Sequence, residues 1–92
     1  MSAHHDLFKT YDEWRDWTVL EGDAIRSSDW PKVNSCQRAK LELQGRIIRY
    51  TEAARAEVSR SGVSWSEIEK RLRSEVASLI DLENKNGETL AQ

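Results

Sequence analysis

Apolar residues recur every three or four positions along most of this chain, which is the period of an amphipathic helix. The pattern is longest after Trp30-Pro31, where proline suits the first turn of a helix because it has no amide hydrogen to lose. No strong breaker follows until Ser61-Gly62, since the lone Gly45 costs only about 1 kcal/mol relative to alanine. The pattern therefore predicts a long central helix over residues 30–60. Its apolar stripe consists of Val33, Cys36, Leu43, Ile47, Tyr50, Ala54 and Val58.

A shorter helix is predicted on each side of this segment. Thr10-Tyr11-Asp12-Glu13 fits a capping box and predicts a first helix over residues 11–28. Ser64-Trp65-Ser66-Glu67 is a second capping box, with Val63 and Ile68 as a hydrophobic staple, and predicts a third helix over residues 65–86. The stripe of the first helix is Tyr11, Trp14, Thr18 and Ile25, and that of the third is Trp65, Ile68, Leu72, Val76 and Leu79.

The end of the third helix has two interpretations. Asn86-Gly87 fits a helix C-cap, with the glycine in a left-handed conformation. Leu90, however, returns to the apolar stripe, so we favour a helix that runs to about Asn84, with a continuation past Gly87 left open. In that continuation Glu83 and Asn86 lie in the seam and weaken it. We therefore predict a flexible lead-in at 1–9, a single helical domain at 10–86, and a tail or a continuation of the third helix at 87–92.

These elements predict an all-α fold: an antiparallel three-helix bundle, or a helical hairpin, with a long central helix and coiled-coil-like packing. We expect the first helix to lie along the early half of the central helix and the third along its later half. Such partial overlap leaves apolar surface open on the central helix. We therefore predict that the chain forms a homodimer.

Composition narrows the function classes. The chain has 92 residues, of which 38% are hydrophobic and 33% charged, so it is too apolar for a disordered tail. Its net charge of −2, with both signs interleaved, argues against nucleic acid as a partner. No apolar run is long enough to span a bilayer, and the single cysteine fits a reducing compartment. We expect a cytoplasmic protein with no membrane span.

The pattern of reactive side chains predicts a protein that is not an enzyme, with no catalytic, cofactor-binding or metal-binding residues. His4 and His5 fall in the predicted lead-in, where a Ser2-Ala3-His4 terminus could chelate copper, but an inert tail is the favoured interpretation. Cys36 falls on the apolar stripe and is interpreted as a core thiol. The four tryptophans favour core over ligand contact, because large rings seal the ends of a thin bundle. Trp14, Trp30 and Trp65 occupy stripe or capping positions, and Trp17 is the least certain of the four.

Leu41 and Ile48 lie one heptad apart, to the side of the main stripe of the central helix. The favoured interpretation is that the middle helix of a bundle uses two faces. The alternative is an exposed groove for an amphipathic helix of a partner.

The turn and the helix that follows it, AIRSSDWPKVNSCQRAKLELQGRI, resemble the flagellar type III export chaperones of the FlgN and FliT kind. In those families an Ala-Ile-x-x-Gly-Asp-Trp-like turn joins two helices, and a Gln/Arg-rich helix with leucines at three-four spacing follows. The matching residues are Ala24-Ile25, Asp29-Trp30, Val33, Gln37, Lys40, Leu43 and Ile47. The third helix is similar to the FlgN pattern at Leu79-Ile80, Leu82, Asn84, Asn86 and Leu90.

The resemblance implies an export chaperone that binds an amphipathic terminal helix of a flagellar hook- or filament-associated protein before secretion. The alternative hypothesis is a structural or regulatory coiled-coil module that only oligomerises. Five apolar residues on helix flanks, or at the loose end of the third helix, are the predicted partner-binding residues: Leu41, Ile48, Leu79, Leu82 and Leu90.

Overall fold

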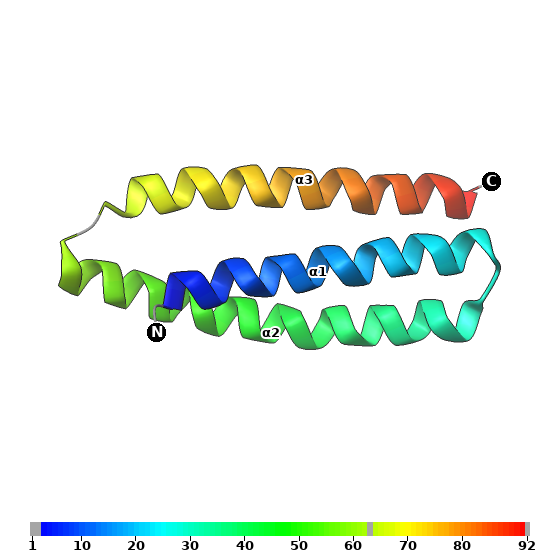
Figure 1. Cartoon of the computed structure of the whole chain (residues 1–92), viewed down its shortest axis with the longest axis horizontal. Helices are drawn as coiled ribbons and strands as arrows, with labels where there is room; N and C mark the ends of the chain where they lie inside the picture. The colour runs from blue at the N-terminus through cyan, green and yellow to red at the C-terminus, as the bar shows by residue number, and fades with distance from the viewer. Residues whose placement is uncertain (1–2, 63, 92) are drawn as a thin grey trace.

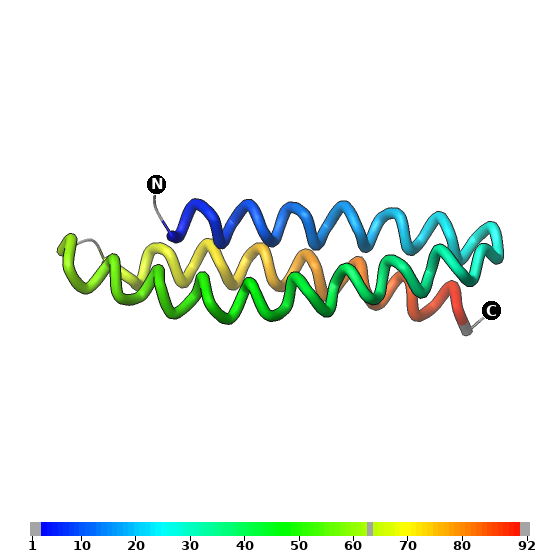
Figure 2. Tube along the Cα trace, turned by 90° about the horizontal axis from the view of Figure 1, so that it is seen from below, coloured from blue at the N-terminus to red at the C-terminus, as the bar shows by residue number. Residues whose placement is uncertain are grey.

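The computed structural model describes residues 3–62 and 64–91, and three helices make up nearly all of them. These are α1 (Ala3–Arg26), α2 (Trp30–Ser61) and α3 (Trp65–Ala91). The chain runs along the rod, back, and along it again, so α1 and α3 are parallel to each other and antiparallel to α2 (Figures 1 and 2). The rod measures 49 × 20 × 15 Å. The all-α three-helix bundle expected from the sequence is confirmed.

The first helix does not begin at the predicted capping box. Thr10 lies inside α1, where it is buried and its hydroxyl donates to the carbonyl of Asp6 at 2.8 Å. A hydroxyl bonded to the preceding turn cannot serve as the cap of a helix that starts at Tyr11. The predicted start was therefore wrong by about two turns.

Residues 3–9, predicted to belong to a flexible lead-in, form the first turns of α1. The amide of Ala3 donates to Glu57 Oε2 of α2 at 2.8 Å, so a carboxylate from another helix caps the positive end of this one. Leu7 and Phe8 are both buried. Because the cap comes from a residue distant in sequence, the local signal at this helix start is weak: one acidic residue, Asp6, in the first turn.

A Schellman motif closes α1 and turns the chain into α2. The amide of Asp29 donates to the carbonyl of Ala24 at 2.8 Å, and that of Ser28 donates to the carbonyl of Ile25 at 3.1 Å. Ser28 takes φ = +59°, the left-handed region in which glycine is usual. The Asp29 side chain then accepts from the amide of Lys32 and caps α2.

The long helix has almost the predicted limits. It begins at Trp30 with proline in its first turn and ends at Ser61. Gly62 follows with φ = +76° and donates its amide to the carbonyl of Val58 at 3.2 Å, a left-handed C-cap. The predicted role of Trp30 was wrong, since this side chain is 51% exposed and seals no core.

The third helix begins at Trp65, as predicted, and continues to Ala91. Asn86-Gly87 is therefore not a C-cap. The favoured end at about Asn84 was wrong, and the continuation past Gly87, which had been left open, is confirmed. The proposed staple between Val63 and Ile68 rests on a residue outside the described ranges.

The helix at the centre of the packing is α1 and not the longer α2. Arg46 of α2 pairs with Glu13 of α1 at 3.4 Å, whereas Arg15 of α1 pairs with Glu75 of α3 at 2.8 Å. α1 packs along both of its neighbours, whereas the backbones of α2 and α3 approach each other closely at few places. The expected arrangement, with both outer helices packed on the long one and only partly overlapping, was wrong. α1 begins at Ala3, before the predicted start, and α3 continues to Ala91, past its predicted end. These two helices therefore lie side by side along most of their length (Figure 1).

The core follows this arrangement as a line of apolar contacts along α1. One cluster joins Phe8, Val58 and Ile68 near the α2–α3 connection, and another joins Ala24, Ile25 and Val33 near the α1–α2 turn. Cys36 is buried, which confirms it as a core thiol. Among the residues whose burial is described, the remaining buried hydrophobic ones are Leu7, Leu43, Ala54 and Leu79.

Candidate functional site

An apolar groove lies between α2 and α3, where the two outer helices diverge above α1. Its volume is about 230 Å³. Tyr11 and Trp14 of α1 contribute to its lining, so the helix that both neighbours share forms its floor. The remaining lining residues come from the flanking helices: Gln44 and Ile47 of α2, and Val76, Leu79, Ile80 and Glu83 of α3.

The groove exists because only one side of the apolar surface of α3 packs into the bundle. Leu79 packs inward and is buried, whereas Ile80, one residue further on, points about 100° away around the helix and is 53% exposed. In a closed three-helix bundle this flank would meet α2. Here the backbones of α2 and α3 approach each other closely at few places, so Ile80 stays at the rim of the groove.

Burial has one visible effect on the chemistry of the groove floor. The Tyr11 phenol has its pKa raised above the ordinary value because burial disfavours the phenolate. The phenol is therefore neutral at physiological pH. The floor presents aromatic rings and no charge of its own.

Glu83 closes one end of the groove with a set of polar contacts. Its Oε1 accepts from Trp14 Nε1 at 3.2 Å and from Lys40 Nζ at 2.5 Å, and lies 3.2 Å from the Thr18 hydroxyl. The Lys40 ammonium also lies 5.6 Å from the centroid of the Trp14 ring. All three helices therefore meet at this carboxylate.

A buried polar layer continues from Glu83 into the bundle. Lys40 Nζ also donates to Glu21 Oε1 at 3.1 Å, and both side chains are almost fully buried. Asn86 Nδ2 donates to Glu21 Oε1 at 3.1 Å and to the Thr18 carbonyl at 2.9 Å. We name Thr18, Glu21, Lys40, Glu83 and Asn86 the polar layer.

The sequence pattern did not predict this layer. Glu83 and Asn86 were expected to weaken the seam of α3, but in the structure each has partners from α1, and Glu83 also from α2. One signal was present: Lys40 lies on the apolar stripe of α2, four residues after Cys36 and three before Leu43. A lysine on a buried stripe requires an acidic partner.

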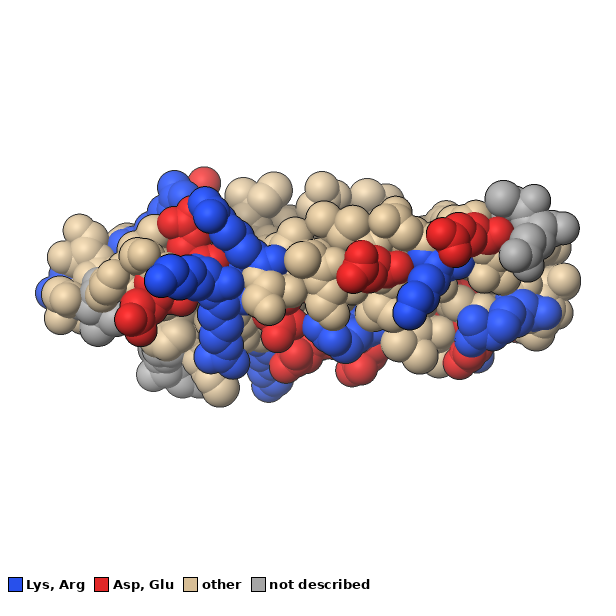
Figure 3. All heavy atoms as spheres, turned by 90° about the horizontal axis from the view of Figure 1, so that it is seen from above, with Lys and Arg blue, Asp and Glu red and all other residues tan. Residues whose placement is uncertain are grey.

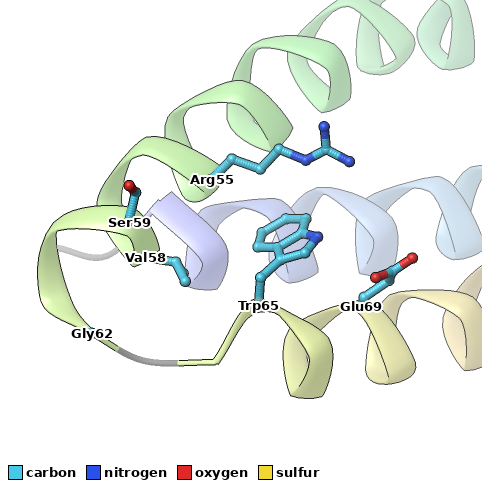
Figure 4. A pocket seen from close by; sticks show the side chains of 6 residues that line it. All are labelled: Arg55, Val58, Ser59, Gly62, Trp65 and Glu69. Atoms are coloured by element: carbon cyan, nitrogen blue, oxygen red, sulfur yellow. The ribbon is translucent and has the colours of Figure 1, made fainter.

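A second, shallower hollow lies where α2 passes into α3. Arg55 lies over the Trp65 ring, 5.2 Å from its centroid, and Glu69 stands beside them (Figure 4). The hollow has a volume of about 600 Å³ and is widely open. Its lining is Arg55, Val58, Ser59, Gly62, Trp65 and Glu69. The same seam between α2 and α3 is thus open at two places.

The structure does not bring the five predicted partner-binding residues together. Leu79 is buried on the inner side of the groove and Leu82 is half-buried. Leu90 is exposed near the end of α3. Leu41 and Ile48 are 69% and 57% exposed on α2, outside the lining of the groove. The favoured interpretation that both pack on a second face within the bundle was therefore wrong.

Three observations concern the groups in the described part of the chain that could carry chemistry. No three His, Cys, Asp or Glu side chains among the described residues are grouped so that they could hold a metal ion. Burial, and secondarily the Glu21 carboxylate, raises the pKa of the Cys36 thiol, which opposes formation of a nucleophilic thiolate. His4 lies at the start of α1 with its Nδ1 3.8 Å from Glu57 Oε1.

Surface charge offers no single-sign patch on the face that Figure 3 shows. Lys and Arg alternate there with Asp and Glu, and uncharged side chains separate the groups. This distribution matches the net charge of −2. None of the described helices contains a stretch long and apolar enough to cross a membrane.

Comparison of the chain with protein-family models, curated proteins and solved structures found no match.

Proposed function

We propose that this chain is a non-enzymatic, cytoplasmic protein that binds an amphipathic helix of a protein partner. The observation that carries the proposal is the groove between α2 and α3, with its aromatic floor and the half-exposed Ile80 at its rim. A fourth helix laid there would complete a four-helix bundle and cover this apolar surface. The helix that fits has one apolar face.

The resemblance of the turn and of α2 to the FlgN and FliT kind of chaperone supports a more specific proposal. The partner is a terminal helix of a secreted flagellar hook or filament protein, held in the groove until export. Such a helix is amphipathic, because its apolar face packs against other subunits after assembly. A chaperone that covers this face prevents premature association.

The test is capture of partners from a flagellated host by the tagged chain and two matched variants. Ile80→Asp places a charge at the rim of the groove, whereas Val19→Asp places one at a residue of similar exposure on α1, 49% against 53%. Val19 lines none of the hollows described above. Circular dichroism verifies that both variants keep their helices.

We expect the wild type and Val19→Asp to retain the same hook or filament protein, and Ile80→Asp to retain at least about tenfold less. A peptide covering the terminal helix of that protein should then bind the purified wild type and Val19→Asp with similar affinity, and Ile80→Asp more weakly. Equal retention by Ile80→Asp, or recovery of the chain alone while flagellar proteins are expressed, would contradict the proposal.

The second candidate function is an oligomerisation module. It is favoured by Leu41 and Ile48, which are exposed on α2 at heptad spacing and lie outside the groove lining. The two functions are compatible, because they use different surfaces. Under this candidate the chain associates with itself as a homodimer.

A further inference from the structure

One face of α2 points away from the bundle and carries apolar residues that neither of the other two described helices covers. The buried residues of α2, among them Cys36, Leu43 and Ala54, define its inward side. Leu41 and Ile48 lie on the outward side. We name Leu41, Gly45 and Ile48, with the neighbouring charges Arg38, Glu42, Arg49 and Glu52, the outer face of α2. Apart from the half-buried Gly45, all of these residues are exposed.

Gly45, at the centre of this face, has no explanation within the chain. A Cβ added there would meet only the Arg49 guanidinium, at 3.9 Å, which is ordinary contact distance. A glycine in a helix interior nevertheless costs about 1 kcal/mol relative to alanine. A glycine between two exposed apolar residues permits close approach of another backbone, and two helices in contact lie about 8–10 Å apart.

The charges around Gly45 identify the occupant of the face. Arg38 lies seven residues before Gly45 and Glu52 seven after it, with opposite signs. Glu42 lies three residues before and Arg49 four after, again with opposite signs. Leu41 and Ile48, both apolar, lie four before and three after. On reversal about Gly45, Arg38 falls on Glu52. Within one residue, Leu41 also falls on Ile48 and Glu42 on Arg49.

We propose that a second copy of this chain binds the outer face of α2, with the two α2 helices antiparallel and crossing at Gly45. A two-fold axis there places Leu41 against Ile48 of the other copy and Arg38 against Glu52, and each contact occurs twice. A parallel pair would instead place Arg38 against Arg38. The inference deepens the proposed homodimer and uses no residue of the groove lining.

The charges of the outer face are available for such pairing. Within the described ranges, Arg38, Arg49 and Glu52 form no ion pair inside the chain. Of the described cationic side chains, Glu42 approaches only that of Arg46, at 3.9 Å. Between Arg38 and Glu52 of the other copy, opposite charges fix the direction of pairing, and the apolar contacts beside Gly45 supply most of the affinity.

Light scattering of the purified chain at tens of micromolar tests the association. We expect a dimer whose dissociation constant rises at least about tenfold in Leu41→Glu and in Ile48→Glu, with helicity unchanged. Leu20→Glu, an exposed leucine of α1, is the control and should leave the dimer intact. Arg38→Glu should weaken the dimer several-fold, and Arg38→Glu combined with Glu52→Arg should restore it.

Thiol cross-linking tests the orientation. Gly45→Cys lies beside the two-fold axis and should cross-link to its own copy through a short bismaleimide. Ser59→Cys should not, because an antiparallel pair places it near Trp30 of the other copy. The wild type, whose only cysteine is buried, is the control. Oligomeric state verifies that each variant remains a dimer.

Each result separates this inference from the proposals above. A monomer in light scattering would overturn both the homodimer and its geometry, and would leave the groove untouched. A dimer that Leu41→Glu and Ile48→Glu do not weaken would keep the homodimer and overturn this face. Cross-linking at both positions would overturn the antiparallel orientation.

Discussion

The three helices meet in chemically different ways in the two halves of the rod. Near the α2–α3 connection they meet through hydrocarbon, with Phe8, Val58 and Ile68 in one cluster and Trp65 and Leu72 packed against it. Towards the α1–α2 turn they meet through the polar layer, in which Lys40 forms ion pairs with Glu21 and Glu83. Apolar side chains tolerate small shifts between helices, whereas hydrogen bonds of fixed direction do not. We infer that the polar layer sets the register of α3, and that the apolar cluster mainly adds stability.

The largest loss in the free energy of unfolding is expected from removing the lysine of the polar layer. Lys40→Met leaves the buried Glu21 carboxylate with Asn86 as its remaining donor. Removing one partner of a buried ion pair typically costs about 3–5 kcal/mol. We expect a loss of this size in urea unfolding, seen as a lower midpoint with an unchanged slope.

The matched control neutralises the other charge. Glu21→Gln added to Lys40→Met removes the uncompensated carboxylate, so the double variant should regain part of the lost stability. A neutral effect of Lys40→Met, or additive losses in the double variant, would show that the charges of the layer are not coupled.

The apolar cluster should respond to lost volume and little to a change of shape. Phe8→Ala empties a buried site beneath the Arg71 guanidinium, which lies 3.9 Å from the ring centroid. We expect a loss of about 3 kcal/mol, because large-to-small changes remove both burial and packing. Phe8→Leu, which keeps most of the volume, should cost less than about 1.5 kcal/mol. If Phe8→Leu were as costly as Phe8→Ala, the cluster would also depend on exact shape.

Two glycine variants test how tightly the polar layer holds α3. A Cβ on Gly22 would lie 2.6 Å from Asn86 Oδ1, so Gly22→Ala must displace Asn86 from its hydrogen bonds. We expect a net loss of about 1–2 kcal/mol in spite of the better helix propensity of alanine. Gly87 has no such neighbour, and Gly87→Ala should gain up to about 1 kcal/mol. A gain in both variants would mean that Asn86 moves aside without cost.

The sequence was most informative where the deciding interactions are local. The start of α2 at Trp30 follows from Asp29 and Pro31, and its end follows from Gly62, all within one turn of the boundary. The start of α3 also agreed with its sequence signal. Helix number and order follow from such signals together with the apolar stripes.

The sequence was misleading where the deciding partner is remote. Thr10 resembles a cap, but α1 begins at Ala3 because Glu57 reaches it from α2. Glu83 and Asn86 look unfavourable in an apolar seam until Lys40 and Glu21 are placed beside them. The hydrophobic pattern alone does not tell how closely two helices pack. It therefore did not show that α2 and α3 diverge and open the groove.

The smallest change in stability is expected at alkaline pH, and it comes from Cys36 in the polar half of the rod. Burial, and secondarily the Glu21 carboxylate, raises the pKa of the Cys36 thiol in the folded chain. As pH rises past the ordinary thiol value of about 8.5, the unfolded chain ionises first and is favoured. The contribution to stability is therefore complete below this value and is lost as pH rises towards the folded pKa, by at most about 1.4 kcal/mol per pH unit. Urea unfolding of the reduced protein between pH 7.5 and 9.5 should show this decline in the wild type and a smaller one in Cys36→Ala. Equal declines in the wild type and in Cys36→Ala would show that titratable groups other than the Cys36 thiol cause the effect.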